Sequence, residues 1–348
     1  MPDAPKLYPL PTGYLIVDDY SRGKLETLSI GDYGKPFNVK ANFLGYTRPI
    51  AGVPNTHCMP LSEKWVVTLS TQYGCRMRCT FCDVPKVPWR GNATSEDMMG
   101  QLLTALAQFP DVHYTERLNI HFARMGEPIF NEAVFDFAEH LHKTKGTDLF
   151  LSSGVRVEVL HPVLTTSLPA SFAPLRDRIM RWCDIKNSLY HGQAGFQFSI
   201  NSTNESQRRE MFGGMSLSLN EFSIIAAAMP PPVSRKYCLN FAYSTDFEID
   251  AALLRKLFNP EKFMVKITPI HNNNACRENA IRTVGGYDSF APYQRSEEDL
   301  IAAGFDVLIF VPSMDEEQGL VTCGNAILGG SRLTVEDGPM KIHGLATR

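Results

Sequence analysis

Three cysteines stand close together in the segment Cys75-Arg-Met-Arg-Cys79-Thr-Phe-Cys82. Their spacing is C-x3-C-x2-C, and an aromatic residue, Phe81, precedes the last cysteine. Three thiolates can bind three irons of a 4Fe–4S cluster, which leaves the fourth iron without a protein ligand. An iron with open coordination positions can bind a small molecule, so this spacing predicts iron–sulfur chemistry on a bound cofactor or substrate.

A zinc site and a chance group of thiols are the alternatives for these cysteines. A structural zinc site uses four ligands, commonly arranged as C-x2-C pairs, and no second pair follows Cys82. A chance group of buried thiols is not expected directly after a strand-like run and before a polar loop. The cluster with an open iron is therefore the favoured interpretation, ahead of another metal site or chance.

The elements that must position these cysteines alternate between strands and helices. Seven segments are predicted to form strands: Trp65–Ser70, Leu118–Ala123, Asp148–Ser152, Phe196–Ile200, Tyr237–Tyr243, Phe263–Thr268 and Asp306–Val311. Helices are predicted between them, from the cap Thr94 to Leu106 and at Asn131–Lys143, Leu175–Lys186, Leu219–Met229, Ile249–Phe258 and Ser296–Ala303. This alternation implies βαβ units and a parallel sheet. The cysteine loop follows the first of these strands, which places the chemistry at the carboxyl end of the sheet, where barrel folds hold their sites.

The residues before Trp65 differ from the rest in their predicted secondary structure. Short β-type runs at Leu15–Val17, Leu25–Ile30 and Phe37–Phe43 are separated by turn residues, and no amphipathic helix is expected there. We therefore predict an α/β protein with three parts: a β-rich N-terminal extension (1–64), a partial (β/α)6 TIM-type barrel (65–330) and a loosely packed tail (331–348).

Composition agrees with a cytoplasmic protein that does not enter a membrane. The chain has 348 residues, of which 44% are hydrophobic and 20% charged, as in ordinary globular proteins. No apolar stretch reaches the roughly 18 residues of a membrane span, and the first residues do not have the pattern of a signal peptide. Eight cysteines, three of them at cluster spacing, favour a reducing compartment. A net charge of −3 gives no general attraction for nucleic acid, although Arg76, Arg78, Lys86 and Arg90 form either a local basic patch or a solvated loop.

A second motif follows the second strand, in Arg124-Met125-Gly126-Glu127-Pro128-Ile129-Phe130-Asn131. Gly126 permits a close backbone approach, and Glu127 can accept a hydrogen bond from an ammonium group. Alone, this segment is a strand-to-helix turn capped by Asn131. Together with the cysteines it resembles the radical-SAM superfamily, in which a Gly-Glu-Pro turn binds the methionyl amine of S-adenosylmethionine. The resemblance implies that Cys75, Cys79 and Cys82 hold a 4Fe–4S cluster whose electron cleaves that cofactor to a 5′-deoxyadenosyl radical.

Further segments narrow the resemblance to the RlmN/Cfr family of radical-SAM RNA adenine methyltransferases, over about residues 65 to 330. They occur in the family's order: Leu69–Cys75, Met125–Pro128 with Asn131, Ser152-Ser153-Gly154-Val155, Phe198-Ser199-Ile200-Asn201, Thr268–Asn272 and Val321-Thr322-Cys323-Gly324-Asn325. In that family a cysteine in a Cys-Gly context is methylated by one S-adenosylmethionine. A radical made from a second one then takes hydrogen from the S-methyl group, and the methylene radical adds to an sp2 carbon of the substrate. Cys323 stands at that position, so the resemblance implies that Cys323 is catalytic; a lone cysteine is otherwise commonly a small buried hydrophobe.

The resemblance also implies cofactor contacts. Gly126 and Glu127 match the family directly, and Ser199 and Asn201 occupy its Ser-x-His positions, with Asn in place of His. Ser152 and Ser153 stand for a Ser-Thr-Ser-Gly run that is one residue shorter here. Either His271 or Asn272 replaces an asparagine of the family, and Asn272 is the preferred choice.

Three features match the family only weakly or depart from it. Glu26 resembles a glutamate credited with proton abstraction, but a solvent-facing strand residue is the simpler interpretation. Thr68 stands where the family has a second catalytic cysteine, and threonine cannot perform thiol exchange; Cys58 or Cys276 are the candidate substitutes. The family's helical RNA-binding region is replaced by the β-type segment before Trp65.

The favoured function is therefore methyl or methylene transfer through Cys323 to a small molecule, a nucleotide or a peptide. Methylation of RNA is one alternative, and a rearrangement or cyclisation that uses S-adenosylmethionine only as an oxidant is another. A non-catalytic metal-binding or sensor protein is the third. An electron donor such as flavodoxin or ferredoxin is the implied protein partner.

Overall fold

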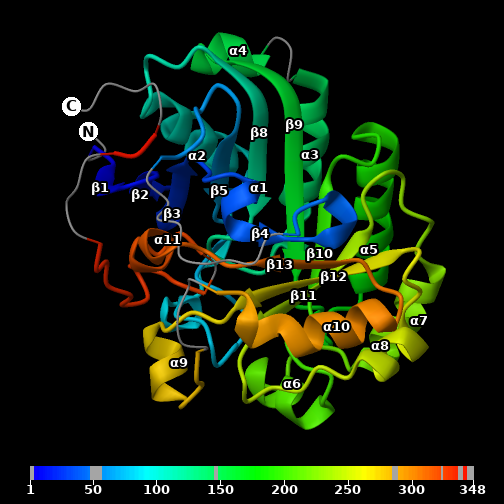
Figure 1. The fold of residues 1–348 in the computed structure, drawn as a ribbon. Coiled ribbons are helices and arrows are strands. Elements are labelled where there is room, and N and C mark those ends of the chain that lie inside the picture. Colours follow the sequence, from blue (N-terminus) through cyan, green and yellow to red (C-terminus); the bar gives the residue numbers. More distant parts are fainter. Residues whose placement is uncertain are drawn as a thin grey trace.

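The computed structural model describes residues 4–47, 57–144, 148–283, 289–322, 324–335 and 340–342. Within these residues, one sheet of eleven strands runs through the molecule in the order β1-β2-β3-β5-β8-β9-β10-β11-β12-β13-β4 (Figure 1). The run from β5 to β13 is parallel throughout, and the strands at both edges are antiparallel. The α/β class with a large parallel sheet is confirmed. The strand order is linear, so the described strands do not form a closed barrel.

The strands of the sheet, in sheet order, are β1 (Lys6–Leu10), β2 (Gly13–Tyr20), β3 (Gly23–Ile30), β5 (Trp65–Leu69), β8 (Tyr114–Phe122), β9 (Arg156–Thr166), β10 (Gly195–Ser199), β11 (Tyr237–Tyr243), β12 (Phe263–Pro269), β13 (Val307–Phe310) and β4 (Val39–Lys40). A separate two-stranded sheet pairs β6 (Gln72–Tyr73) with β7 (Gly91–Asn92). The helices are α1 (Lys35–Asn38), α2 (Ser95–Ala107), α3 (Glu132–Thr144), α4 (Asp148–Ser153), α5 (Leu175–Asp184), α6 (Glu205–Met211), α7 (Leu219–Ala228), α8 (Ala251–Leu257), α9 (Asn274–Glu278), α10 (Gln294–Ala302) and α11 (Met314–Gln318).

The first long helix shows how sequence and packing agree. Thr94 and Asp97 form a reciprocal capping box at the start of α2, which satisfies two backbone N–H groups that the helix leaves free. Met98, Leu102 and Leu106 then follow at helical spacing and are buried in the main core. This core lies on the face of the sheet that the longer helices cover, as α3 and α5 do in Figure 1.

One predicted strand is wrong. Residues 148–153 form helix α4, and the strand that follows is β9, whose eleven residues begin at Arg156. Gly154 takes a positive φ of 72°, a conformation that commonly ends helices. The β-branched residues after it then pair with β8 and β10. The predicted strand over Phe37–Phe43 is also mostly wrong, because α1 and a 3-10 turn at Asn42–Leu44 leave only the two residues of β4.

The N-terminal strands are part of the main sheet rather than a separate layer. Strand β3 pairs with β5, and β4 pairs with β13, so the first residues of the chain extend the sheet at both of its edges. Within the described part of the chain, no helix combines the length and the apolar character needed to cross a membrane.

Candidate active site

The cysteine loop leaves the carboxyl end of β5, and Cys75 and Cys82 lie close enough to Cys79 to act on it electrostatically. Burial raises the pKa of Cys75 to about 12. The pKa of Cys79 is also raised well above its ordinary value, first by burial and then by the neighbouring Cys82 and Cys75. Three desolvated thiolates would repel one another unless a cationic group lay between them, so this donor set fits an iron–sulfur cluster.

Side chains of the described residues do not gather in threes around one point, as the His, Cys, Asp or Glu ligands of a single metal ion do. The thiolates of a 4Fe–4S cluster bind different irons, so the three cysteines need not meet at one point.

Backbone contacts hold the cysteine loop against its surroundings. The N–H of Thr80 donates to the carbonyl of Met211 at 2.8 Å, which joins the loop to the end of α6. Gly213, with φ 58°, lies so close to the loop that an added Cβ would be 2.6 Å from the carbonyl oxygen of Arg78. The loop path is therefore set by its neighbours.

Asp83, directly after the last cysteine, is the strongest of these anchors. Its side chain is fully buried and accepts hydrogen bonds from the N–H of Ala275 at 2.9 Å and from the hydroxyl of Ser331 at 2.6 Å. Its own N–H donates to the carbonyl of Gly324 at 2.8 Å. One carboxylate thus joins the cysteine loop to α9 and to the C-terminal loop. Sequence reasoning missed Asp83, because nothing in its spacing distinguishes it from an ordinary loop aspartate.

The Gly-Glu-Pro turn after β8 is joined to the segment that leads into the cysteine loop. The N–H of Thr71 donates to the carbonyl of Met125 at 2.7 Å, and the side-chain oxygen of Gln72 accepts from the N–H of Glu127 at 3.0 Å. Gly126 has φ 98°, and a Cβ there would lie 2.6 Å from two side-chain carbons of Gln72. Only glycine fits this approach, which brings the two predicted motifs together at one edge of the sheet.

The carboxylate of Glu127 is buried and accepts from two backbone groups. The N–H of Ser167 donates to it at 2.7 Å and that of Ile129 at 3.2 Å. Burial nevertheless raises the pKa of Glu127 to about 7. No Lys or Arg of the described chain forms an ion pair with it, so an ammonium group of a ligand would supply the missing positive charge.

Ser199 and Asn201 lie at the carboxyl end of β10, at the same edge of the sheet. Asn201 has φ 63°, which asparagine tolerates better than most residues, and its side-chain oxygen accepts from the N–H of Ala242 at 3.0 Å. The side-chain oxygen of Asn240, paired with Ser199 in the register of β10 and β11, is buried without a partner in the described residues. An unpaired buried acceptor beside these positions fits a ligand that donates hydrogen bonds.

Arg208, missed in the sequence, fixes the end of β10. It is buried, and it donates to the carbonyl oxygens of Ser199 at 2.9 Å and Ile200 at 2.6 Å. Its two backbone contacts hold the strand end that carries Ser199.

Ser152 and Ser153 are not brought to this edge. They end helix α4, which precedes the amino end of β9, whereas Glu127 lies at the carboxyl end. The eleven residues of β9 span roughly 30 Å at about 3.3 Å per residue. The residues that do reach Glu127 from β9 are Thr166 and Ser167. This error follows from the wrong strand prediction over 148–152, which placed these two serines at the carboxyl end of the third parallel strand.

The region of His271 and Asn272 is occupied by local contacts. His271 and the N–H of Asn272 both bond to the carboxylate of Glu317, the latter at 3.0 Å, and Asn272 is exposed. The next residue, Asn273, is buried and donates to the carbonyl oxygens of Phe81 and Gly324, both at 2.9 Å. Asn273 therefore joins the cysteine loop to the segment around position 323.

Cys323 itself lies outside the described residues. Of the two candidate substitutes for the cysteine missing at Thr68, Cys276 lies beside the cysteine loop, with its sulfur 3.7 Å from the carbonyl oxygen of Phe81. Cys58 instead forms a backbone β-bridge with Ile342. Burial raises the pKa of both thiols to about 12, which keeps them protonated in the free protein.

Glu26 is fully buried, so the expectation of a solvent-facing glutamate is wrong. One oxygen accepts from Arg124, at 2.6 and 3.0 Å, and the other accepts from the N–H of Leu328 at 2.7 Å. Both carboxylate oxygens are thus engaged in holding β3 to the turn after β8 and to the C-terminal loop.

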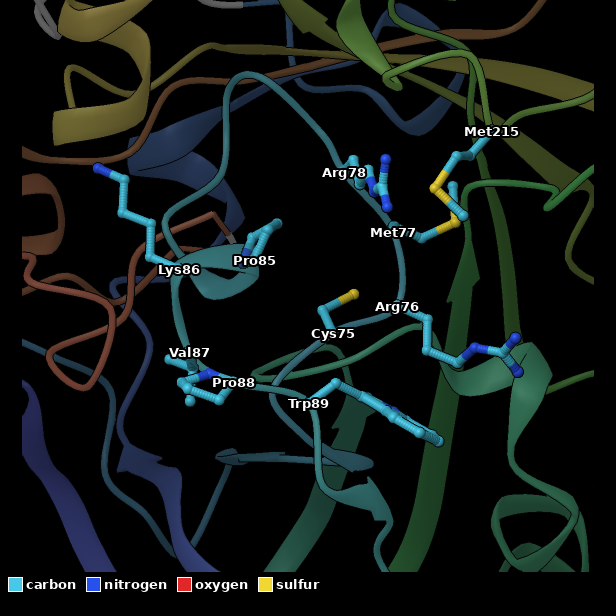
Figure 2. Close-up of a pocket in the computed structure, with 10 residues that line it drawn as sticks. All are labelled: Cys75, Arg76, Met77, Arg78, Pro85, Lys86, Val87, Pro88, Trp89 and Met215. Atoms are coloured by element: carbon cyan, nitrogen blue, oxygen red, sulfur yellow. The ribbon is translucent and has the colours of Figure 1, made fainter.

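A pocket of about 430 Å³ opens beside Cys75 (Figure 2). Cys75 points into the space that the loop surrounds, and Arg76 lies on the other side of the backbone. The guanidinium of Arg76 stacks 5.4 Å from the ring of Trp89 and 5.0 Å from that of Phe130. Lys86, by contrast, pairs with Asp83 and Glu278, both at 2.9 Å. Of the four cations expected to form either a basic patch or a solvated loop, Lys86 is thus neutralised, and Arg76 lies against two aromatic rings.

The fold is similar to that of a solved radical SAM methyltransferase from Sphaerobacter thermophilus, with a TM-score of 0.62 and 18% sequence identity over 93% of this chain and 81% of that one. No protein-family model matches the sequence.

Part of the sequence is similar to RlmN methyltransferases. The chain is 36% identical to the dual-specificity RNA methyltransferase RlmN of Solidesulfovibrio magneticus over 103 residues, 29% of this chain and 28% of that protein. It is 29% identical to a probable dual-specificity RNA methyltransferase RlmN of Synechocystis sp. over 155 residues, 44% of this chain and 37% of that protein. The matches thus span less than half the length of these relatives. The resemblance to the RlmN/Cfr-like radical-SAM proteins predicted from the motifs is confirmed, for a divergent sequence.

Proposed function

We propose that this protein is a radical-SAM enzyme that transfers a methyl or methylene group to an sp2 carbon through Cys323. One observation carries the proposal: the cysteine loop after β5 and the Gly-Glu-Pro turn after β8 are joined by backbone hydrogen bonds at the carboxyl edge of one parallel sheet. The similarity to a radical SAM methyltransferase supports it, and the parallel strands would then form a partial barrel.

Separate groups of residues are proposed to bind the cluster and the cofactor. Cys75, Cys79 and Cys82 would hold the 4Fe–4S cluster, and Glu127 would accept the methionyl ammonium of S-adenosylmethionine. When bound, the cluster and this cofactor supply a one-electron cleavage that yields an adenosyl radical. Ser199, Asn201 and Asn240 would contact the rest of the cofactor, and Thr166 and Ser167 take the place proposed from the sequence for Ser152 and Ser153.

Cys323 is proposed as the methyl carrier because its neighbour in the chain is anchored at the cluster loop. The carbonyl of Gly324 accepts from the N–H of Asp83 and from the side chain of Asn273. The acceptor is proposed to be a small molecule, a nucleotide or a peptide; the RlmN relatives are named as RNA methyltransferases, and RNA is the alternative. A flavodoxin or ferredoxin would supply the electron.

Anaerobic reconstitution tests the cluster. The Cys79→Ala variant should lose the bound cluster and all cleavage of S-adenosylmethionine, whereas Cys183→Ala, which alters a buried thiol on α5, should retain both. Full iron content with cofactor cleavage in Cys79→Ala would refute the assignment.

Mass spectrometry tests the carrier. The wild-type protein incubated with S-adenosylmethionine should gain one methyl group on Cys323 and release S-adenosylhomocysteine. Cys323→Ala should do neither, while uncoupled formation of 5′-deoxyadenosine continues. If only methionine and 5′-deoxyadenosine form and Cys323 stays unmodified in the wild type, the cofactor acts solely as an oxidant.

A further inference from the structure

One face of the parallel sheet packs against the covering helices. The opposite face carries cations near the amino ends of the strands, and the proposed function does not use them. Along β8 the side chains alternate between two faces, and Leu118 and Ile120 are buried in the main core. Arg117, Asn119 and His121 therefore point to the other face, away from the covering helices. The neighbouring strand β9 adds His161, and Arg235 lies just before β11.

Two arginines meet on one histidine at this place. Nη2 of Arg117 lies 3.2 Å from Nδ1 of His161, and Nη1 of Arg235 lies 2.8 Å from Nε2 of the same ring. A neutral imidazole has one acceptor nitrogen and one N–H, so it can accept from only one of the two guanidinium groups. Burial and the two arginines lower the pKa of His161 to about 2, so the ring is neutral. In either tautomer, one guanidinium faces an N–H group of the ring and cannot donate a hydrogen bond to it.

Within the described residues, no carboxylate pairs with the two arginines of this group. Arg235 forms no ion pair with any carboxylate of the described residues, and Arg117 donates its other hydrogen bond to the neutral Asn119 at 3.1 Å. Burial lowers the pKa of Arg235 to about 10 and also lowers that of Arg117. Lys35 is a further cation near this group. Burial lowers its pKa most, and the charges of Arg235 and Arg117 lower it further, so they reach this side chain.

Two carboxylates act against these shifts. The charges of Asp32 and of the exposed Glu116 raise the pKa of Arg117. The charge of Asp32 also raises the pKa of Lys35. One oxygen of Asp32 pairs with Lys64 at 2.5 Å, and the other accepts from the N–H of Gly34. Asp32 is therefore already engaged. Arg117, Arg235 and Lys35 are half-buried, so each loses part of its hydration without gaining a carboxylate partner among the described residues, which favours a bound anion as the missing partner.

We propose that Arg117, Arg235 and His161 form a binding site for a phosphate group, either free or carried by a ligand. Two guanidinium groups match the geometry of an oxyanion, and the further positive charge of Lys35 favours a dianion over a singly charged carboxylate. The site is separate from the cluster edge, because His161 precedes Ser167 by six residues, or roughly 20 Å of extended strand. Its test therefore does not depend on the proposed methyl transfer.

Titration with inorganic phosphate tests the site, with the full chain kept at constant ionic strength by chloride. The wild type should show saturable binding by calorimetry and a matching rise in its unfolding temperature. Arg235→Gln should weaken phosphate binding about ten- to a hundredfold, as expected when one charge-assisted contact is lost. Arg156→Gln, which removes an exposed arginine of the same strand as His161, should bind as the wild type does.

Three results would overturn the proposal: no saturable phosphate binding in the wild type, equal binding by Arg235→Gln, or formate binding as tightly as phosphate. A second arm uses a phosphate monoester, such as a nucleoside monophosphate. Tighter binding of the monoester than of phosphate assigns the site to a phosphorylated ligand, and weaker binding assigns it to the free ion.

Stability in phosphate-free buffer separates this role from a structural one. If the arginines are arranged to bind an anion, Arg235→Gln should unfold at the same or a higher temperature than the wild type, because a half-buried charge without a carboxylate partner in the described residues is removed. If the contact with His161 only supports the fold, the variant should unfold at a lower temperature at every phosphate concentration. Should Arg235→Gln fail to fold, Arg117→Gln and the wild-type titration decide the question.

Discussion

The two ends of the parallel sheet differ in how their charged side chains are paired. At the carboxyl end, Glu26 and Arg124 pair with each other, and the remaining oxygen and nitrogen of the pair bond to Leu328 and Leu320. Towards the amino end, Arg117 and Arg235 share one neutral histidine. Within the described part of the chain, the first network is thus complete, whereas the second stays open, because Arg117 and Arg235 have no carboxylate partner there. A site that must hold a reactive group gains from a rigid frame, whereas an incomplete network is suited to a ligand that completes it.

The largest effect is expected from breaking the complete network. Arg124→Met leaves Glu26 buried without its partner, which should lower the free energy of unfolding by about 3–5 kcal/mol. Chemical denaturation measures this change. Adding Glu26→Leu to Arg124→Met should recover part of the loss, because the unpaired charge is then removed. If the two residues are not coupled, the two single losses of stability add. A double variant whose loss equals the sum of the losses in Arg124→Met and Glu26→Leu would therefore contradict the prediction.

The next effect comes from the close contact of Gly126. An alanine there combines an unfavourable φ of 98° with a Cβ 2.6 Å from Gln72, so Gly126→Ala should cost about 2–4 kcal/mol. Gly154 also has a positive φ, of 72°, but nothing lies within 4 Å of its added Cβ. Gly154→Ala should therefore cost only about 1–2 kcal/mol. Equal losses of thermal stability in the two variants would contradict the tight junction at the carboxyl end.

Removal of the Glu127 carboxylate should affect the cofactor rather than the cluster. Glu127→Ala loses one charge-assisted contact to an ammonium group, which corresponds to about 1.5–3 kcal/mol, or roughly ten- to a hundredfold in affinity for S-adenosylmethionine. Equilibrium binding to the reconstituted protein measures it. Glu132→Ala, at the exposed start of α3, serves as the control. Iron content should be unchanged in both variants, and unchanged affinity in Glu127→Ala would remove this residue from the cofactor site.

The smallest effect is a change in pH dependence at the open network. His161 is neutral in the folded protein because burial, Arg235 and Arg117, and further His121 and Lys64, lower its pKa to about 2. The unfolded chain binds more protons below the ordinary histidine pKa of about 6.5, so this group costs stability as the pH falls through 6.5. Between pH 7 and 5.5, His161→Gln should therefore lose about 1 kcal/mol less stability than the wild type. Parallel stability curves for the two proteins would show that His161 is not held neutral.

The order of motifs in the sequence was sufficient to predict the carboxyl end of the sheet in outline. Cysteine spacing and the Gly-Glu-Pro turn are local patterns, and each follows a strand whose apolar residues are evident. Their meeting at one edge then follows from the parallel arrangement of neighbouring strands. The third strand was misplaced because Leu149-Phe150-Leu151 is apolar enough to suggest a strand, while the true strand begins after Gly154. Because the strand was predicted too early in the chain, Ser152 and Ser153 were expected at its carboxyl end. They lie instead before the amino end of β9.

By itself, the sequence determined the class of cofactor chemistry and the alternation of strands and helices, because both depend on residues that are close in the chain. Only the tertiary structure decided which polar side chains complete the frame. Asp83 meets Ser331 across 248 positions, and Glu26 meets Leu328 across 302. Arg117, on β8, and Arg235, just before β11, reach opposite nitrogens of His161. Such contacts depend on strand order and register, which no local pattern contains, and they determine which charged side chains of the described residues are paired and which are not.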